Sequence, residues 1–337
     1  MPFAFRYRDI LRTIVFFLVV LGGLSQPCRA ANDPLPSWND GASKQAIVDF
    51  VGRVTKEGGP DYVAPPERIA TFDNDGTLWA EQPLYFQGFF VFDRVKAMGK
   101  REPGLLARQP FKAVAEGDMK ALAEQGEHGL AELLAATHSG MTVDAFAKIA
   151  KEWIATAKHP KLDRPFTQLV YQPQLELLTY LRAHGFKTFI VSGGGIEFIR
   201  AFSEDVYGIP PEQVIGSSGK TQFELREGNG VLDKLPELGS NDDGPGKPIN
   251  INLHIGRRPI LAFGNSDGDL QMLQYTASGP GARLMLLVHH DDAEREFAYD
   301  RQSKIGKLDK ALDEAAAKKW TVVSIKNDWK NVFPPKP

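Results

Sequence analysis

Short apolar runs alternate with helical patterns through the second half of the sequence. Runs typical of buried strands lie at 187–191, 259–263 and 283–288, with helical periodicity between them. Because parallel strands are usually joined by crossover helices, this alternation predicts an α/β fold: a doubly wound, Rossmann-like parallel sheet with helices on both faces. The predicted strands are 68–72, 187–191, 213–216, 259–263, 283–288 and 321–325, and the core helices are 174–183, 196–206 and 269–275.

A long helical stretch interrupts this pattern. From residue 79 to 165 the periodicity is that of helices without strands, for example at 143–154, where Thr142 is a predicted N-cap. This stretch predicts an all-helical cap inserted after the first strand. The expected organisation is a signal peptide at 1–30, an N-terminal helix and first core strand at 31–78, the helical cap at 79–165, the α/β core at 166–290 and a C-terminal extension of the core at 291–337.

Two other segments lie outside the alternation. Apolar residues at helical spacing between 46 and 54 predict one amphipathic helix that packs on the main domain. The polar, glycine-rich segment 217–247 predicts a flap, with hairpin-like pieces at 221–225 and 230–232.

The N-terminus has the pattern of a secretory signal peptide. Arg6, Arg8 and Arg12 precede an apolar run at 14–24, and small residues follow around Ala30, after which we expect cleavage. An uncleaved membrane anchor is the alternative, but the run is shorter than the ~20 residues that a spanning helix needs. The sequence therefore predicts a periplasmic or secreted protein with no stable membrane association once the signal is removed.

Composition narrows the classes of function. With 42% hydrophobic and 24% charged residues in 337, the chain is typical of a globular protein with a substantial core. The formal net charge of −2 gives no reason to expect a nucleic-acid partner. The single cysteine, Cys28, is removed with the predicted signal, so the mature protein would have no disulfide, catalytic thiol or thiolate metal site.

Two aspartates directly follow the first predicted strand. Asp73 and Asp75 are two residues apart, so in extended chain they project to the same side, at the end of a parallel sheet where ligands bind. Asp73 is the better nucleophile because it comes first off the buried strand, and a carboxylate can form an acyl-phosphate. Asp75 is placed to act as general acid and then base. Paired acids before Gly76 also occur in ordinary turns, which is the alternative for this pair alone.

Two later segments supply candidate phosphate-binding groups. Ser192 and Gly193 end the strand at 187–191, where a hydroxyl and backbone amides can bind phosphoryl oxygens. Lys247 precedes the next core strand, and its ammonium can offset charge on Asp73 and on a phosphoryl group. Lys220 and Lys234 are rival candidates for this role.

The segment 264–269, Gly-Asn-Ser-Asp-Gly-Asp, again joins a strand end to a helix. Its clustered oxygen donors suit Mg²⁺, a hard cation that prefers carboxylates, carbonyls and water. Asp269 is equally well placed to cap the following helix. The adjacent His289 and His290 lack the spacing of a helical zinc site.

These four segments, in this order and each at a strand end, resemble the signature of the haloacid dehalogenase superfamily, and the Val-Ser-Gly-Gly run at 191–194 with an inserted cap resembles its phosphoserine phosphatase branch. The resemblance implies Asp73 as nucleophile, Asp75 as acid and base, Ser192 and Gly193 as phosphoryl ligands and Lys247 as charge partner. It also implies Mg²⁺ on the Asp73 carboxylate, the Asp75 carbonyl and a residue of the fourth segment. Asn265 stands at the position where the family usually has a metal-binding aspartate. Either Asn265 or Asp269 is therefore the expected ligand, and we expect Mg²⁺ to bind more weakly than with an aspartate at this position.

We therefore expect an exported, magnesium-dependent phosphatase that hydrolyses small phosphate monoesters through an aspartyl-phosphate. A non-catalytic periplasmic binding protein for phosphate esters is the alternative. A dehalogenase would not need the acid at Asp75. Cap residues are expected to select the substrate, and those nearest the first aspartates are Trp79, Glu81, Gln82, Tyr85, Phe86 and Gln87.

Overall fold

An eight-stranded sheet forms the centre of the computed structural model, which describes residues 33–336; the predicted signal peptide and its cleavage site lie outside the described residues. Residues 35–336 belong to one compact unit. The strands are β1 (Ile69–Phe72), β2 (Lys187–Gly195), β3 (Val214–Arg226), β4 (Asn229–Ser240), β5 (Leu261–Gly264), β6 (Leu284–Asp291), β7 (Ala298–Tyr299) and β8 (Thr321–Ser324).

The strand order is β4-β3-β2-β1-β5-β6-β7, with β8 also paired to β6. β1 pairs in parallel with both β2 and β5, so the direction in which the chain adds strands reverses at β1. Only β3–β4 and β6–β7 pair antiparallel among the named strands of the described chain. The predicted doubly wound, mainly parallel α/β fold is confirmed, and the reversal at β1 is the place where such sheets bind ligands.

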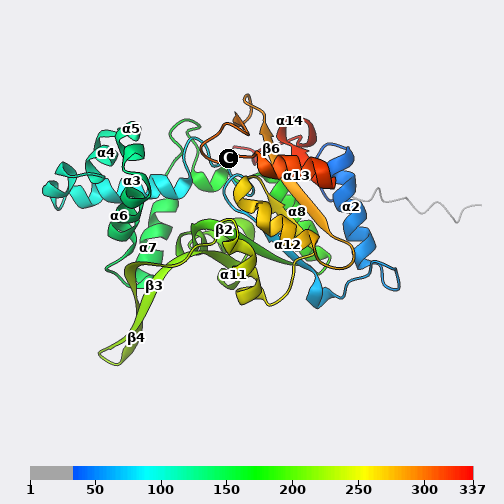
Figure 1. Cartoon of the computed structure of the whole chain (residues 1–337), viewed down its shortest axis with the longest axis horizontal. Helices are drawn as coiled ribbons and strands as arrows, with labels where there is room; N and C mark the ends of the chain where they lie inside the picture. Colours follow the sequence, from blue (N-terminus) through cyan, green and yellow to red (C-terminus); the bar gives the residue numbers. More distant parts are fainter. Residues whose placement is uncertain (1–32, 337) are drawn as a thin grey trace, which may run out of the picture. The chain divides into compact units, whose positions relative to one another are not determined.

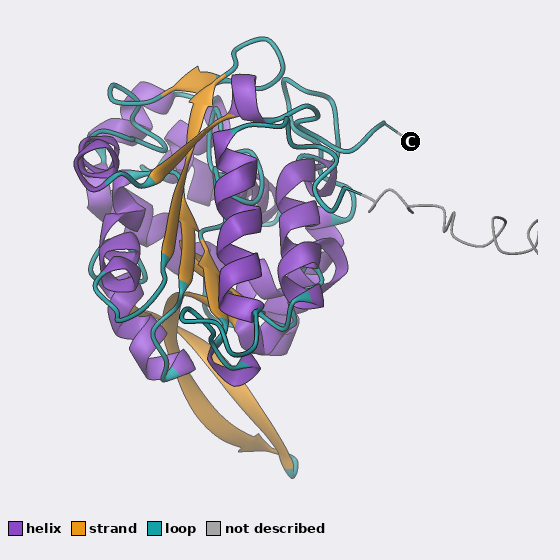
Figure 2. Ribbon diagram, turned by 90° about the vertical axis from the view of Figure 1, so that its right-hand side faces the viewer, coloured by secondary structure: helices purple, strands orange, loops and turns teal. Residues whose placement is uncertain are grey.

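Helices cover both faces of the sheet (Figure 2). Neighbouring residues of a strand point to opposite faces, as Ile190 and Val191 do when they enter two different hydrophobic clusters. The first cluster includes side chains of α2 (Ala42–Thr55), α8 (Gln172–Ala183) and α9 (Ile196–Arg200). The second includes side chains of α11 (Gly246–Ile255), α12 (Leu270–Ala277) and α13 (Lys310–Lys318).

The segment between β1 and α8 is helical, as the sequence predicts, and its α3–α6 part lies to one side of the sheet (Figure 1). Its small apolar core is separate from the two sheet clusters. Thr142 caps the last helix of the segment, because its Oγ1 accepts a hydrogen bond from the Ala145 amide at 3.1 Å. The helices are α3 (Phe86–Gly99), α4 (Phe111–Glu116), α5 (Met119–Glu124), α6 (Gly126–His138) and α7 (Val143–Ile154).

Several elements differ from the expected bounds. The predicted helix 196–206 is two short helices, α9 and α10 (Ser203–Tyr207), and the predicted flap is one continuous β3–β4 hairpin that projects from the sheet (Figure 1). β2 runs on to Gly195 through a bulge, because glycines tolerate the irregular pairing with β3. In the C-terminal extension, α13 is the helix expected beside the predicted strand β8, and β7 and α14 (Ile325–Asp328) are additional. In the described part of the chain, no helix has the length and apolar character needed to cross a membrane.

Candidate active site

Asp73 lies at the end of β1, in the middle of the sheet. Its amide donates to the Phe263 carbonyl at 2.9 Å, which extends the β1–β5 pairing by one residue. The residue is 7% exposed. Burial, and then the negative charge of Asp269, raise the pKa of Asp73 well above its ordinary value, while Lys247 opposes this rise.

Lys247 is the cation that contacts this carboxylate. Its Nζ lies 2.7 Å from Asp73 Oδ1 and 2.7 Å from Asp269 Oδ1, and it donates to the Val191 carbonyl at 2.7 Å. Burial lowers the pKa of Lys247, but Asp269 and Asp73 raise it by more, so the side chain stays charged. Of the rival lysines, Lys234 pairs with Glu197 and Lys220 is exposed on the hairpin.

Asp75 is held by Trp79. The indole Nε1 donates to Asp75 Oδ1 at 2.8 Å, and the Trp79 ring is fully buried and stacked on Phe202 with centroids 4.5 Å apart. Burial raises the pKa of Asp75 to about 6, so the group can hold a proton in mildly acidic solution. Trp79 thus orients the candidate acid and does not itself line the substrate cavity.

The Ser192–Gly195 run lies beside these acids. Ser192 Oγ accepts from the Gly194 amide at 3.1 Å, and the Gly195 amide donates to Gln87 Oε1 at 2.8 Å. These two amides are therefore already satisfied, and α9 is too short to act as a helix N-terminus for anions. Ser192 and Gly193 both line the cavity that contains Asp73.

The fourth segment folds into a capping box. Ser266 Oγ accepts from the Gly268 amide, and Asp269 Oδ2 accepts from the amides of Asn265 and Ser266 at 2.9 and 3.0 Å. The second oxygen of Asp269 contacts Lys247. Both oxygens of Asp269 are therefore used to hold the segment and the lysine, and Ser266 is the residue that caps.

Glu81 lies against Asn265. Asn265 Nδ2 and the Tyr299 hydroxyl donate to Glu81 Oε1 at 2.7 and 2.8 Å. A Cβ atom at Gly76 or Gly306, both of which have positive φ, would lie 2.4 or 1.9 Å from the same oxygen. The two glycines thus make room for a buried carboxylate, and burial raises the pKa of Glu81 well above its ordinary value.

These residues fit a magnesium site. The charges of Asp269 and Asp75 act on Asp73, and those of Asp75 and Asp73 act on Glu81. In the described chain, the cation beside Asp73 and Asp269 is Lys247. Such an excess of buried negative charge favours a bound cation. The described residues contain no cluster of three or more His, Cys, Asp or Glu with metal-binding geometry. Mg²⁺ also accepts amide and carbonyl oxygens as ligands.

The end of β6 and the C-terminal extension support the loop after β1. His290 Nε2 donates to the Gly76 carbonyl at 2.8 Å, and its Nδ1 lies 3.1 Å from Glu296 Oε2. Tyr171 donates its hydroxyl to Glu296 Oε1 at 3.1 Å. Gln82, a predicted substrate-selecting residue, donates instead to the Ile305 carbonyl at 3.0 Å and does not line the cavity.

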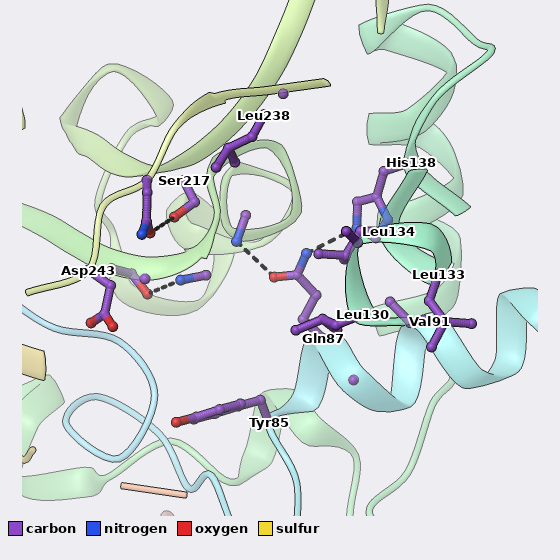
Figure 3. Close-up of a pocket in the computed structure, with 18 of the residues that line it drawn as sticks. Tyr85, Gln87, Val91, Leu130, Leu133, Leu134, His138, Ser217, Leu238 and Asp243 are labelled. Atoms are coloured by element: carbon purple, nitrogen blue, oxygen red, sulfur yellow. Dashed lines mark hydrogen bonds between the residues drawn. The ribbon is translucent and has the colours of Figure 1, made fainter. Parts of the chain in front are cut away.

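A cavity of about 920 Å³ opens from these acids toward the cap. Its inner end is lined by Asp73, Asp75, Ser192 and Lys247, and Glu81 also reaches it. Tyr85 and Gln87 from the start of α3 line its side (Figure 3). Of the cap residues expected near the substrate, Glu81, Tyr85 and Gln87 border this space, while Phe86 is buried in the core.

Residues 70–274, more than half of the chain, match the sequence profile of the haloacid dehalogenase-like hydrolase family. The protein belongs to this family. The predicted superfamily is thereby confirmed, and the protein is a hydrolase of the haloacid dehalogenase type. No curated protein shows significant sequence similarity to it.

Three solved structures similar to this hydrolase come from bacteria. A protein of unknown function from Bordetella pertussis Tohama I is 16% identical, with 76% of this chain and 98% of that chain covered and a TM-score of 0.46. A conserved, functionally unknown protein from Anaerococcus prevotii is 16% identical, with 83% and 90% covered and a TM-score of 0.48. A phosphoserine phosphohydrolase-like protein from Francisella tularensis is 17% identical, with 74% and 99% covered and a TM-score of 0.38.

Sequence reasoning about this hydrolase missed several residues at the site. His290, Tyr299 and Gly306 all come from the end of β6 or the C-terminal extension, more than 200 residues after the loop that they contact. Asp243 lines the cavity, and its Oδ1 lies 3.6 Å from the Cβ position of Gly193. Gly306 has a positive φ, a conformation that favours glycine. The presence of a glycine at this position was therefore the one signal in the sequence that pointed to it.

Proposed function

We propose that this hydrolase is a magnesium-dependent phosphatase that cleaves phosphate monoesters through an aspartyl-phosphate on Asp73. The observation that carries the proposal is the pair of unlike acids at the end of β1. Asp73 contacts the Lys247 ammonium at 2.7 Å, and Asp75 is anchored by Trp79 with its pKa raised by burial to about 6. Two carboxyl groups in different environments suit two roles, nucleophile and acid.

The first chemical step uses both acids. A carboxylate oxygen of Asp73 attacks phosphorus, and the bond from phosphorus to the ester oxygen breaks. Asp75 gives its proton to the departing oxygen, so the product leaves as a neutral alcohol. Lys247, 2.7 Å from Asp73, offsets negative charge on the transferring phosphoryl group.

The second step reverses the role of Asp75. The carboxylate takes a proton from water, whose oxygen attacks the phosphorus of the acyl-phosphate. The bond from phosphorus to the Asp73 oxygen breaks, which releases inorganic phosphate and restores both acids. Ser192, a buried residue that lines the cavity together with Gly193, would donate to a phosphoryl oxygen in both steps.

Magnesium, when bound, would neutralise phosphoryl charge and fix the phosphate for in-line attack. Asp73, the Asp75 carbonyl and Asn265 would hold it. Asn265 Oδ1 already accepts one hydrogen bond, from the Thr77 hydroxyl at 3.1 Å, whereas the oxygens of Asp269 serve Lys247 and two backbone amides, so Asp269 is the less suited of the two. Glu81, in contact with Asn265 at 2.7 Å, would supply the negative charge that Asn265 lacks.

Export of the protein is part of the proposal and rests on the sequence of residues 1–30. An exported phosphatase would release inorganic phosphate from small esters outside the cytoplasm. Fractionation of a bacterium that expresses the full chain tests this part. Recovery of a shortened chain, beginning after Ala30, outside the cytoplasm is expected, and full-length chain confined to the cytoplasm would refute export.

The activity itself is tested with a generic aryl phosphate. Purified protein with Mg²⁺ is expected to release phosphate, and Asp73→Asn to reduce turnover by at least a thousandfold. Asp144→Asn, an exposed acid in the first turn of α7, is the matched control and should keep full activity. Unchanged turnover in Asp73→Asn would overturn the mechanism, and tight ester binding without any turnover in the wild-type protein would favour a binding protein instead.

A further inference from the structure

The cavity beside Asp73 is lined mostly by apolar side chains of the cap. α6 contributes Leu130, Leu133 and Leu134 on one side, and Leu238 of β4 lies on another (Figure 3). Val91 of α3 adds to the helical wall. Apolar side chains that surround a cavity favour an apolar ligand, because the removal of apolar surface from water lowers the free energy.

The apolar wall extends outward from the acids along α6. Leu130, Leu134 and His138 are spaced four residues apart, so they lie on one face of the helix. With a rise of about 1.5 Å per residue, this face is roughly 12 Å long. Leu130 and Leu238 are 55% and 65% exposed, so the apolar surface continues to the mouth of the cavity.

Two polar side chains, Gln87 and His138, lie at the inner end of this wall. Gln87 accepts from the Gly195 amide, and its Nε2 lies 3.0 Å from His138 Nε2. Burial and the nearby Lys234 lower the pKa of His138 to about 3, so the ring is neutral at physiological pH. This end of the cavity therefore offers no positive charge from histidine.

The lysines that line the cavity are already paired. Lys234 lies 3.1 Å from Glu197, and Lys247 contacts Asp73 and Asp269. No arginine lines the cavity in the described part of the chain. A leaving group that carries a carboxylate or a second phosphate would thus meet no free cation, and would lie near the acids Glu237 and Asp243.

We propose that the preferred substrate is a phosphate monoester of a long, uncharged, apolar alcohol, with its phosphate at Asp73 and its hydrocarbon chain along the α6 face that ends at Leu130. This inference rests on the proposed phosphatase function and names its substrate class. It disfavours phosphoserine and nucleotides, since their charged groups would be buried against an apolar wall without a partner.

A series of primary alkyl monophosphates tests the inference. From ethyl to decyl phosphate, kcat/KM is expected to rise about threefold to fourfold per added methylene until the cavity is filled, because each buried methylene adds favourable transfer free energy. Phosphoserine and glycerol phosphate are expected to be at least a hundredfold poorer than decyl phosphate. A flat profile across the alkyl series would overturn the inference.

Two matched variants locate the chain-binding surface. Leu130→Glu places a charge at the mouth and is expected to lower the ratio of kcat/KM for decyl to ethyl phosphate at least tenfold. Leu253→Glu makes the same change at a 70%-exposed helical position that does not line the cavity, and should leave this ratio unchanged. Equal ratios in the two variants would place the chain elsewhere and overturn the inference.

The outcomes separate this inference from the phosphatase proposal. If no phosphate ester at all is hydrolysed, including an aryl phosphate, the phosphatase function fails. If the aryl phosphate is hydrolysed but chain length has no effect, the substrate class alone fails. Calorimetry adds a readout without turnover, in which Asp73→Asn is expected to bind decyl phosphate at least tenfold more tightly than ethyl phosphate.

Discussion

The Lys247 ammonium lies 2.7 Å from Asp73 Oδ1, and both side chains are buried at the centre of the sheet. The same ammonium contacts Asp269, so one cation separates two carboxylates that would otherwise repel each other. Removing the cation leaves two uncompensated buried charges, whereas the pair itself contributes little net stability. Because Lys247 contacts both carboxylates, a change of this lysine is expected to affect both the reactivity of Asp73 and the stability of the loop that carries Asp269.

Lys247→Met is expected to lower kcat at least a hundredfold and to destabilise the fold by about 3–5 kcal/mol, because it removes one partner of buried ion pairs. Aryl phosphate turnover and urea unfolding measure the two effects. Lys220→Met, at an exposed hairpin position, is the control and should change neither. A Lys247→Met variant with normal turnover would show that the lysine has no part in catalysis.

The pH dependence of activity should reflect Asp75. Its pKa of about 6 lies above the ordinary 3.8, so the protonated, donating form is present below pH 6 and is lost as pH rises through 6. For alkyl phosphates, kcat/KM is expected to fall about tenfold per pH unit above that value. Asp75→Asn should lower the rate about 10²–10⁴-fold and abolish this limb. A limb that persists in Asp75→Asn would assign the titration to another group.

Glu81→Gln should weaken magnesium binding without altering the shape of the site. The glutamine can still accept from Asn265 and Tyr299, but the charge is lost, and we expect a tenfold to hundredfold rise in the Kd for Mg²⁺. Calorimetry with Mg²⁺ alone measures it.

A second substitution provides the rescue for that experiment. Asn265→Asp in the Glu81→Gln background restores one charge at the same place and should recover most of the affinity. Glu197→Gln, a cavity carboxylate paired with Lys234, is the control and should leave the Kd for Mg²⁺ unchanged. Equal Kd values for Glu81→Gln and the wild-type protein would remove Glu81 from the metal site.

His290→Phe should destabilise the loop after β1. The change leaves the Gly76 carbonyl and the buried Glu296 carboxylate without their histidine partner, which costs about 2–4 kcal/mol of unfolding free energy. His289→Phe is the control, because His289 is partly exposed and its nearest carboxylate oxygen, on Asp300, is 3.4 Å away. Urea unfolding compares the two, and equal midpoints would argue against the supporting role of His290.

Much of the fold follows from local patterns. Strands 68–72 and 187–191 are visible as short apolar runs and the helical cap as a periodicity of 3.6, and the structure contains β1, β2 and α3–α7 there. The predicted bounds are wrong where local sequence preference and strand pairing favour different structures. The glycines at 193–195 resemble a turn, but pairing with β3 extends β2 through them. The tail predicts one strand and a flanking helix, which the structure contains as β8 and α13, whereas the very short β7 and α14 gave no clear signal.

The sequence by itself was enough to predict the sheet and to select Asp73 and Asp75 as candidate catalytic acids, because the end of a buried strand and a two-residue spacing are local properties. Tertiary structure decided which lysine meets Asp73, which carboxylate lies beside Asn265, and that the C-terminal extension encloses Glu81. A parallel sheet brings strand ends together from segments far apart in the chain, whereas the directions of side chains that leave loops follow from packing.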